Sequence, residues 1–309
     1  MSRQYFGKFH ENQMYEKGFF HGRGATVEGR LRGDPPSRIG IPKDNPFRPF
    51  PLSDPWGFRR AVVPIFGQDV SEITGVGTAF HIGGRGRFLT ANHNIPRKKY
   101  TSADIGEIPI TDPLATRLLL LLPFGLVYGT TKLPENSIVT VNRCGSPLVE
   151  IDDPIESLKG EEPMEALDIA TLEADISRDI AVETLPLRLK GPIPVLGEPV
   201  LALGYPSIRA ETRRPDKSIV TLSEEMKGAF GRITGYFPSG RGRRNPTPVY
   251  QVEANWESGM SGGPVLNQAG EVIGVVSHSL LSDDIGVRNG IGYVSAFAYM
   301  TNVTESMKL

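Results

Sequence analysis

The chain has 309 residues, which is long enough for one large or two small domains with a substantial core. Its formal net charge of −1 gives no electrostatic reason to expect nucleic acid as a partner. The 35 glycines and 26 prolines are many for a helical protein and favour a turn-rich β architecture.

The sequence carries no signal that would direct the chain into or across a membrane. Residues 1–8 and those that follow hold no apolar h-region and no small-residue cleavage site, so we expect no signal peptide. The longest apolar run, Leu118–Leu122, is followed by Pro123 and Gly125 and is too short to span a bilayer, so we interpret it as a buried strand. The single cysteine, Cys144, excludes an intrachain disulfide and favours a reducing compartment. We therefore expect a cytoplasmic protein with no membrane partner.

Residues 1–58 form the least regular part of the sequence. They hold many Gly, Pro and Arg residues and scattered aromatic residues, with little periodicity. The proline-rich segments 34–36 and 46–51 are typical of extended, loop-like chain. We expect a loop-rich extension packed on the body of the protein. A pro-segment and a partner-binding arm are the alternatives.

A histidine follows the first clear pair of strands. Residues 76–82 alternate as in a half-buried strand, residues 85–87 make a turn, and residues 88–91 form the returning strand. His93 comes directly after that strand with small residues before it. A histidine in this place can project into a cleft.

Two aspartates lead apolar segments further along the chain. Asp168 precedes Ile169–Leu172, and Asp179 repeats the same local pattern eleven residues later. Either carboxylate could hydrogen-bond the far nitrogen of His93. Asp168 is favoured because it leaves room for its own strand, a connecting loop and the next strand at residues 197–206.

Two polar segments interrupt the second half of the chain. Residues 207–226 are rich in Arg, Glu and Ser, and residues 222–226 could start a short helix. Residues 238–246 form a basic, flexible loop. A solvated face is the simplest interpretation of this loop, and a substrate-docking loop or a self-cleavage site are the alternatives.

The segment Glu257–Pro264 places Ser261 inside a glycine-rich turn. Glycines on both sides let the backbone turn sharply and hold the hydroxyl out of the core. The amide groups of Gly259 and Ser261 could then form an oxyanion hole. Nucleophilic catalysis by serine needs this geometry together with a histidine base and an acid that orients the histidine. The same residues also fit the α/β-hydrolase elbow, but that fold requires the order serine, acid, histidine, and only His278 follows Ser261.

The order Thr-Ala-x-His, Asp-Ile-Ala and Gly-x-Ser-Gly-Gly-Pro resembles the trypsin/chymotrypsin clan of serine peptidases. Within it, residues 261–275 and 289–294 are most similar to the disulfide-free bacterial branch of HtrA-like and trypsin-like peptidase domains. The resemblance covers roughly residues 60–305. HtrA-like relatives usually append a PDZ domain, and we expect none in this chain, which ends at Leu309.

The resemblance implies an all-β, chymotrypsin-like fold of two antiparallel six-stranded β-barrels with a C-terminal helix. The peptidase domain would span residues 59–309. Its parts would be a first barrel at about 59–157, a second barrel at about 180–294 and a helix at about 295–306, capped by Ser295. The catalytic cleft would lie between the barrels.

The resemblance also implies a reaction through an acyl-enzyme. His93 would take the proton of Ser261, Asp168 would orient the imidazolium, and the amides of Gly259 and Ser261 would hold the oxyanion. The substrate would be a protein or peptide, with no metal ion and no organic cofactor. Secreted relatives carry an aspartate where Met260 stands, so activation by a new amino terminus is not expected. Control would then come from loop ordering, an activating partner or a homo-oligomer.

Four residues are candidates for substrate binding. Aligned on Ser261, Asn255 would form the floor of the primary specificity pocket, and its neutral side chain predicts no strong preference for Arg or Lys unless Glu257 turns inward. Ser277, His278 and Ser279 would line the cleft and pair with extended substrate backbone. His278 could contact an acidic side chain, as glutamate-preferring relatives do with a pocket histidine. Small apolar or uncharged side chains are the default expectation.

Two other functions share these residues. A catalytically latent or inactive protease-fold scaffold would bind a partner without cleaving it, although no member of the triad is missing here. An esterase acting on small acyl substrates would use the same chemistry in a different cleft.

Overall fold

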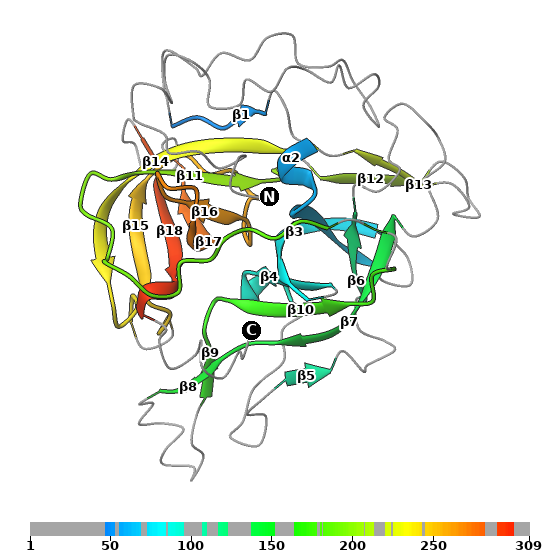
Figure 1. Ribbon diagram of the computed structural model, residues 1–309, viewed down its shortest axis with the longest axis horizontal. Coiled ribbons are helices and arrows are strands. Elements are labelled where there is room, and N and C mark those ends of the chain that lie inside the picture. The colour runs from blue at the N-terminus through cyan, green and yellow to red at the C-terminus, as the bar shows by residue number, and fades with distance from the viewer. Residues whose placement is uncertain are drawn as a thin grey trace.

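Strands dominate the computed structural model of the chain, and helices are short (Figure 1). The structure describes residues 47–52, 56–68, 73–84, 86–95, 107–109, 117–122, 137–151, 164–177, 180, 182–206, 208–212, 220–223, 225–242, 245–281 and 289–299. Among these residues, no helix is long and apolar enough to cross a membrane.

Six antiparallel strands form the first barrel, and the β10–β7 pairing closes it in the order β10-β4-β3-β2-β6-β7. Short β5 (Glu107–Pro109) extends the sheet beside β7. The six strands are β2 (Val62–Gln68), β3 (Ile73–Gly83), β4 (Arg87–Thr90), β6 (Arg117–Leu121), β7 (Ile138–Gly145) and β10 (Ala170–Ala174).

Six further strands form the second barrel, which the β14–β15 pairing closes in the order β14-β11-β16-β17-β18-β15. The strands are β11 (Pro199–Gly204), β14 (Lys227–Phe237), β15 (Val249–Glu253), β16 (Pro264–Leu266), β17 (Val272–Leu280) and β18 (Ile291–Ala296). Two hairpins stand outside the barrels: β8 (Leu148–Glu150) with β9 (Met164–Ala166), and β12 (Arg209–Thr212) with β13 (Val220–Ser223). The predicted pair of six-stranded barrels is confirmed.

The alternation of side chains along the strands produces three cores. In β11, Val200 and Ala202 point into the second barrel, whereas Leu201 and Leu203 point toward the first. Because successive side chains of a strand face opposite sides, a strand between two apolar layers is buried along its whole length, as every residue of β11 is. Continuous apolar runs in the sequence therefore mark the strands that face both a barrel interior and the interface between the barrels.

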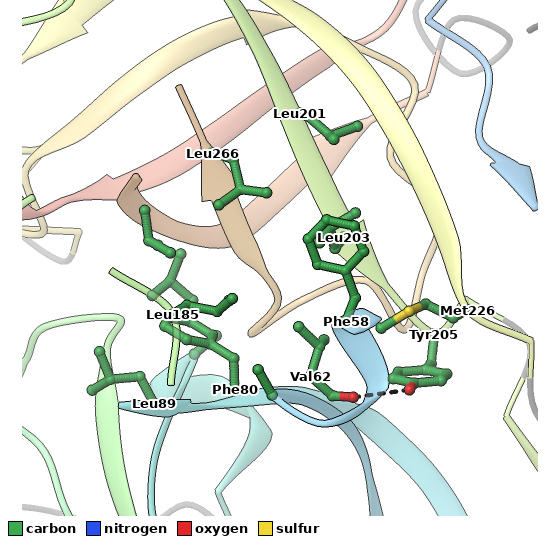
Figure 2. Packing of buried hydrophobic residues seen from close by; sticks show 14 of the residues in the cluster. Phe58, Val62, Phe80, Leu89, Leu185, Leu201, Leu203, Tyr205, Met226 and Leu266 are labelled. Carbon is green, nitrogen blue, oxygen red and sulfur yellow. Dashed lines mark hydrogen bonds between the residues drawn. The ribbon is translucent and has the colours of Figure 1, made fainter. Parts of the chain in front are cut away.

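The core between the barrels joins them into one body (Figure 2). Val62 and Phe80 of the first barrel lie in the same cluster as Leu203 and Leu266 of the second. The hydroxyl of Tyr205 crosses this interface and donates to the Val62 carbonyl at 2.9 Å. The two barrels thus share one packed apolar layer.

The described part of the N-terminal extension packs on the second barrel. Strand β1 (Phe50–Pro51) pairs with β14, and the ring of Phe50 stacks on Phe230 with 5.0 Å between centroids. Phe47 and Leu52 are buried in the core between the barrels. These contacts agree with an extension packed on the body. Helix α2 (Trp56–Arg59) then leads into β2, and residues 1–46 lie outside the described residues.

Two predicted helices are wrong within the described residues. Ser295 does not cap a helix: it lies in β18, which continues to Ala296 because both residues pair across the barrel. Only a 3-10 turn, Phe297–Tyr299, follows, and the rest of the predicted helix lies outside the described residues. Residues 222–223 belong to strand β13 rather than to a helix, because β13 completes a hairpin with β12.

Candidate active site

The turn after β4 places His93 at the mouth of the cleft. Residues Asn92–Asn94 form a single 3-10 turn directly after the strand and Ala91. The side-chain oxygen of Asn92 accepts a hydrogen bond from the Ser146 hydroxyl at 2.5 Å, which ties the turn to the first barrel. The imidazole remains partly exposed, with 36% of its side-chain surface accessible.

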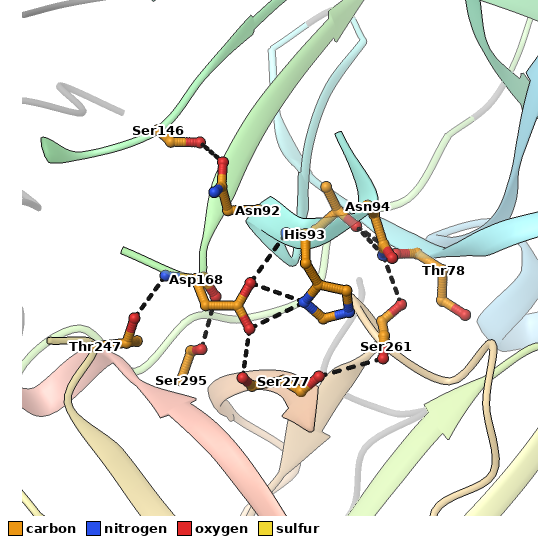
Figure 3. A network of polar contacts seen from close by, with 11 residues as sticks. Thr78, Asn92, His93, Asn94, Ser146, Asp168, Thr247, Ser261, Ser277 and Ser295 are labelled. Carbon is orange, nitrogen blue, oxygen red and sulfur yellow. Dashed lines mark hydrogen bonds and ion pairs between the residues drawn. The ribbon is translucent and has the colours of Figure 1, made fainter. Parts of the chain in front are cut away.

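Asp168 lies two residues before β10 and faces the imidazole (Figure 3). Its carboxylate oxygens are 2.9 and 3.1 Å from His93 Nδ1, and one of them also accepts the main-chain N–H of His93 at 3.1 Å. The second barrel fixes its backbone: the amide donates to the hydroxyl of Thr247 and the carbonyl accepts from the hydroxyl of Ser295, each at 2.7 Å. The structure thus brings together His93 and Asp168, and Asp179 lies outside the described residues.

The carboxylate of Asp168 stays ionised in this setting. Burial alone would raise its pKa, but the hydrogen bonds and charge of His93 and the hydroxyl of Ser277 together hold the pKa below its usual value. Ser277 reaches the carboxylate because a β-bulge between Val276 and His278 leaves it out of the ladder with β18. A negative charge beside Nδ1 fixes the tautomer with the proton on that nitrogen and leaves Nε2 as the basic atom.

Ser261 lies in a turn that needs glycine at two of its positions. Gly259 and Gly262 have φ angles of +93° and +87°. A Cβ on Gly262 would lie 2.0 Å from the Thr78 carbonyl oxygen, so the turn packs directly on the first barrel. The carbonyl of Ser261 accepts hydrogen bonds from the Thr78 amide and the Asn94 side chain, both at 2.9 Å. The hydroxyl of Ser261 donates to the main-chain carbonyl of Ser277 at 3.3 Å.

The main-chain N–H groups of Gly259 and Ser261 are candidates for binding an oxyanion. Neither donates to an acceptor among the residues that the structure describes, in contrast to the Met260 amide between them, which donates to the Glu257 carbonyl at 3.1 Å. The Gly259 carbonyl is fixed by the hydroxyl of Thr78 at 2.8 Å, and the Met260 side chain is fully buried. Two unused donors on a rigid turn beside a serine hydroxyl can stabilise a developing oxyanion.

Comparison with known proteins agrees with this geometry. The trypsin-like peptidase domain profile matches residues 77–275, a range that includes His93, Asp168 and Ser261. The chain belongs to this family. It is 28% identical over 141 residues to the serine endoprotease DegS of Escherichia coli K12, and to its Salmonella typhimurium counterpart over the same length. That alignment covers 45% of this chain and 35% of DegS, so the peptidase matches only about a third of its relative's length.

Solved structures of proteases align over most of the peptidase. The active form of the Rv3671c protease from M. tuberculosis gives a TM-score of 0.43 at 18% identity and covers 80% of this chain and 81% of its own. The serine endoprotease from Yersinia pestis gives a TM-score of 0.42 at 21% identity, covering 81% and 64% of the two chains. The fold assignment rests on the strand pairing described above.

Asn255 and the end of β17, which hold the predicted substrate-binding residues, are fixed by hydrogen bonds to neighbouring segments. Asn255 is buried, and its side-chain oxygen accepts the Gly290 amide at 2.8 Å. The Ser279 hydroxyl donates to the Trp256 carbonyl at 2.6 Å, which ties β17 to the segment before the serine turn. Glu257 does not turn inward, because its carboxylate pairs with Lys227 at 3.1 Å.

His278 is exposed, whereas the other three substrate-binding candidates, Asn255, Ser277 and Ser279, are buried or half-buried. Burial lowers its pKa, and the charges of Arg241 and His93 lower it further, whereas the charge of Asp168 acts in the opposite direction. The charges of His93 and Asp168 thus act on the His278 ring. Ser277 is buried and its hydroxyl binds Asp168, whereas the side chain of His278 faces solvent.

Several polar residues of the site were not predicted as such. Asn94, interpreted only as a turn-former, donates to the Thr90 hydroxyl at 3.0 Å as well as to Ser261. Thr78, Thr247 and Ser295 hold the serine turn and the acid from a distance of 75 residues or more along the chain. No local sequence signal distinguishes such residues from ordinary strand and loop positions.

Neither a metal site nor a reactive thiol is present in the described part of the peptidase. No group of three or more His, Cys, Asp or Glu side chains there could hold a metal ion. Cys144 is buried in the first barrel, where desolvation raises the pKa of its thiol to about 11.

Proposed function

We propose that the peptidase is an active serine endopeptidase that cleaves peptide bonds through an acyl-enzyme on Ser261. The observation that carries this proposal is the paired contact of Asp168 with His93 Nδ1, at 2.9 and 3.1 Å, next to a serine turn contributed by the other barrel. Figure 3 shows the remaining ring nitrogen of His93 on the side of Ser261. Membership of a peptidase family supports the reaction class.

The proposed reaction uses the same groups for forming the acyl-enzyme and for hydrolysing it. His93 Nε2 takes the proton of the Ser261 hydroxyl while Ser261 Oγ bonds to the scissile carbonyl carbon. The carbonyl oxygen, now negative, accepts hydrogen bonds from the amides of Gly259 and Ser261. The imidazolium then gives its proton to the leaving amine, and water releases the acyl group by the same steps. Loss of one oxyanion donor typically costs about 3 kcal/mol of barrier.

Substrate backbone has a place to bind along β17. Residues 278–280 pair with β18 on one side, whereas the pairing with β16 ends at Val275. The other edge of this stretch has no strand partner among the described residues, so an extended peptide can add to it by main-chain hydrogen bonds. Because Asn255 is neutral and Glu257 is held by Lys227, we propose small uncharged side chains at the residue before the scissile bond.

Cleavage of a peptide library tests this function. The native chain and Ser261→Ala are incubated with the same mixture, and cleavage sites are mapped by mass spectrometry. Cuts that follow small uncharged residues and vanish in the variant are expected. Cleavage of matched esters without any cleavage of peptides would favour an esterase instead.

A latent form is the second candidate, and one contact favours it. The Ser261 hydroxyl donates to the Ser277 carbonyl at 3.3 Å, so its O–H bond has to turn toward His93 before proton transfer. Latency would require an activating partner or a homo-oligomer to complete the site. A rate of peptide cleavage that rises steeply with protein concentration would support control by self-association.

A further inference from the structure

An arginine is held at the edge of the cleft by a structured turn. Arg241 lies in the connection between β14 and β15, where its amide donates to the Asn245 carbonyl at 2.9 Å and the Asn245 amide donates to the Gly242 carbonyl at 3.0 Å. Gly240 has a φ of +78°, and a Cβ there would lie 2.2 Å from the Asn245 carbonyl oxygen. The turn therefore has a defined conformation that fixes the starting point of the Arg241 side chain.

An aromatic ring orients the Arg241 side chain toward His278. The guanidinium carbon lies 3.8 Å from the centroid of the Tyr293 ring, close enough for a cation–π contact. Tyr293 on β18 is the register partner of His278 on β17, and cross-strand partners carry their side chains on the same face. Arg241, Tyr293 and His278 thus form one surface, and the charges of Arg241 and His93 both act on the His278 ring.

Arg241 and His278 have no acidic partner among the described residues. Several other basic side chains there do: Arg60, Arg87, Arg143, Arg188 and Lys227 each lie within 3.6 Å of a glutamate oxygen. The half-buried guanidinium of Arg241 therefore contributes a positive charge beside the exposed ring of His278. Such a site binds an anionic group more readily than a neutral one.

The direction of β17 determines which part of a substrate meets this surface. Ser277 contacts both Asp168 and the Ser261 hydroxyl, so the chemistry takes place at that end of the stretch. His278 and the residues after it lead away from the nucleophile. A peptide added antiparallel to β17 along this edge presents the side chains on the amino-terminal side of its scissile bond to His278.

We propose that Arg241 and His278 form a subsite for an acidic side chain of the substrate, two to four residues before the scissile bond. The ring of Tyr293 packs against the guanidinium of Arg241. The subsite rests on the proposed peptidase function and extends it from a preference for small uncharged residues at the cleaved position to an acidic residue nearby.

Binding to the inactive Ser261→Ala variant tests the subsite without requiring catalysis. The probes are fluorescent alanine-rich peptides that carry Glu or Gln at one of the three positions, measured by anisotropy at low salt. We expect the Glu peptide to bind roughly 2- to 5-fold more tightly at one position, as for one partly exposed charge pair. Arg241→Gln should reduce this ratio to near 1, and Arg241→Glu should reverse it in favour of a Lys peptide.

A matched control separates the subsite from general electrostatics. Lys190→Gln removes one positive charge from an exposed position outside the cleft and should leave the Glu-to-Gln ratio unchanged. A ratio of 1 at all three positions, or an equal loss in Lys190→Gln, would overturn the subsite. Hydrolysis by the native chain is measured in parallel. Tight Glu binding without any hydrolysis would contradict the proposed function and leave the subsite standing.

Discussion

The proposed chemistry depends most closely on the carboxylate of Asp168. It receives hydrogen bonds from the ring and the main chain of His93 and from the hydroxyl of Ser277. This set of donors keeps the carboxylate ionised although it is largely buried. Its proposed role is to hold one tautomer of the histidine.

Asp168→Asn should leave the fold intact and lower kcat by roughly 10⁴-fold, because an amide can present its N–H to Nδ1 and stabilise the wrong tautomer. Steady-state kinetics on a peptide substrate measures the effect, with circular dichroism as the control for folding. A loss of less than tenfold would contradict the assignment of Asp168 as the acid.

Asn94 connects the histidine turn to the serine turn. Its side-chain amide is buried and donates to both Thr90 and Ser261. Asn94→Ala should lower stability by about 1–3 kcal/mol, because buried acceptors lose their donor, and should lower kcat more than it raises KM. Asn92→Ala, on the other side of His93, is the matched control. Since Asn92 bonds only within the first barrel, through Ser146, we expect a smaller effect on kcat.

At the scale of elements, the turn after Gly259 is built around close backbone contacts. Gly262 has a positive φ, and a Cβ would meet the Thr78 carbonyl oxygen at 2.0 Å and the Thr90 hydroxyl at 2.2 Å. Both contacts belong to the first barrel, so the turn packs directly against that barrel. A backbone shift at Gly262 would move Ser261 away from His93.

Gly262→Ala should therefore cost more than about 3 kcal/mol, from the strained φ and the clash together. Gly235→Ala is the control, since the nearest atom to its Cβ would be 3.6 Å away, an ordinary contact distance. Its effect should stay within about 1 kcal/mol. Urea denaturation of both variants compares them, and similar midpoints for the two would refute the argument.

Strands were more predictable than helices from the sequence. Alternating or continuous apolar runs mark β2, β3, β6 and β10 because one or both faces of each strand are buried. The helix predicted at Ser295 was wrong because the serine hydroxyl bonds the Asp168 carbonyl across the molecule instead of an amide three residues ahead. In the sequence alone, a serine that caps a helix cannot be distinguished from a strand serine whose hydroxyl bonds a residue far along the chain.

At the scale of the whole molecule, one apolar layer holds the two barrels together. The residues of this layer come from both barrels and from the segment 47–52. His93 and Asp168 are attached to one barrel and Ser261 to the other, so the geometry of the site depends on this interface. The order of motifs in the sequence predicted two barrels, but the polar network of Thr78, Asn94 and Thr247 depends on contacts that only the folded chain creates.

Tyr205→Phe removes a single hydrogen bond across this layer. It should lower the free energy of unfolding by about 1 kcal/mol, the usual net value for a buried hydrogen bond. The apolar contacts remain, so we expect unfolding to stay a single transition in calorimetry. Two separate transitions, in the native chain or in the variant, would show that the barrels are not held as one unit.

The central claim is that Ser261 is activated within the constellation of His93, Asp168 and two unused amides. Intact mass spectrometry after incubation with a fluorophosphonate probe tests it most directly, on the native chain and on Ser261→Ala. We expect one adduct on the native chain and none on the variant. No adduct on either chain would contradict it, because a serine with a base and an oxyanion hole in place reacts with this probe.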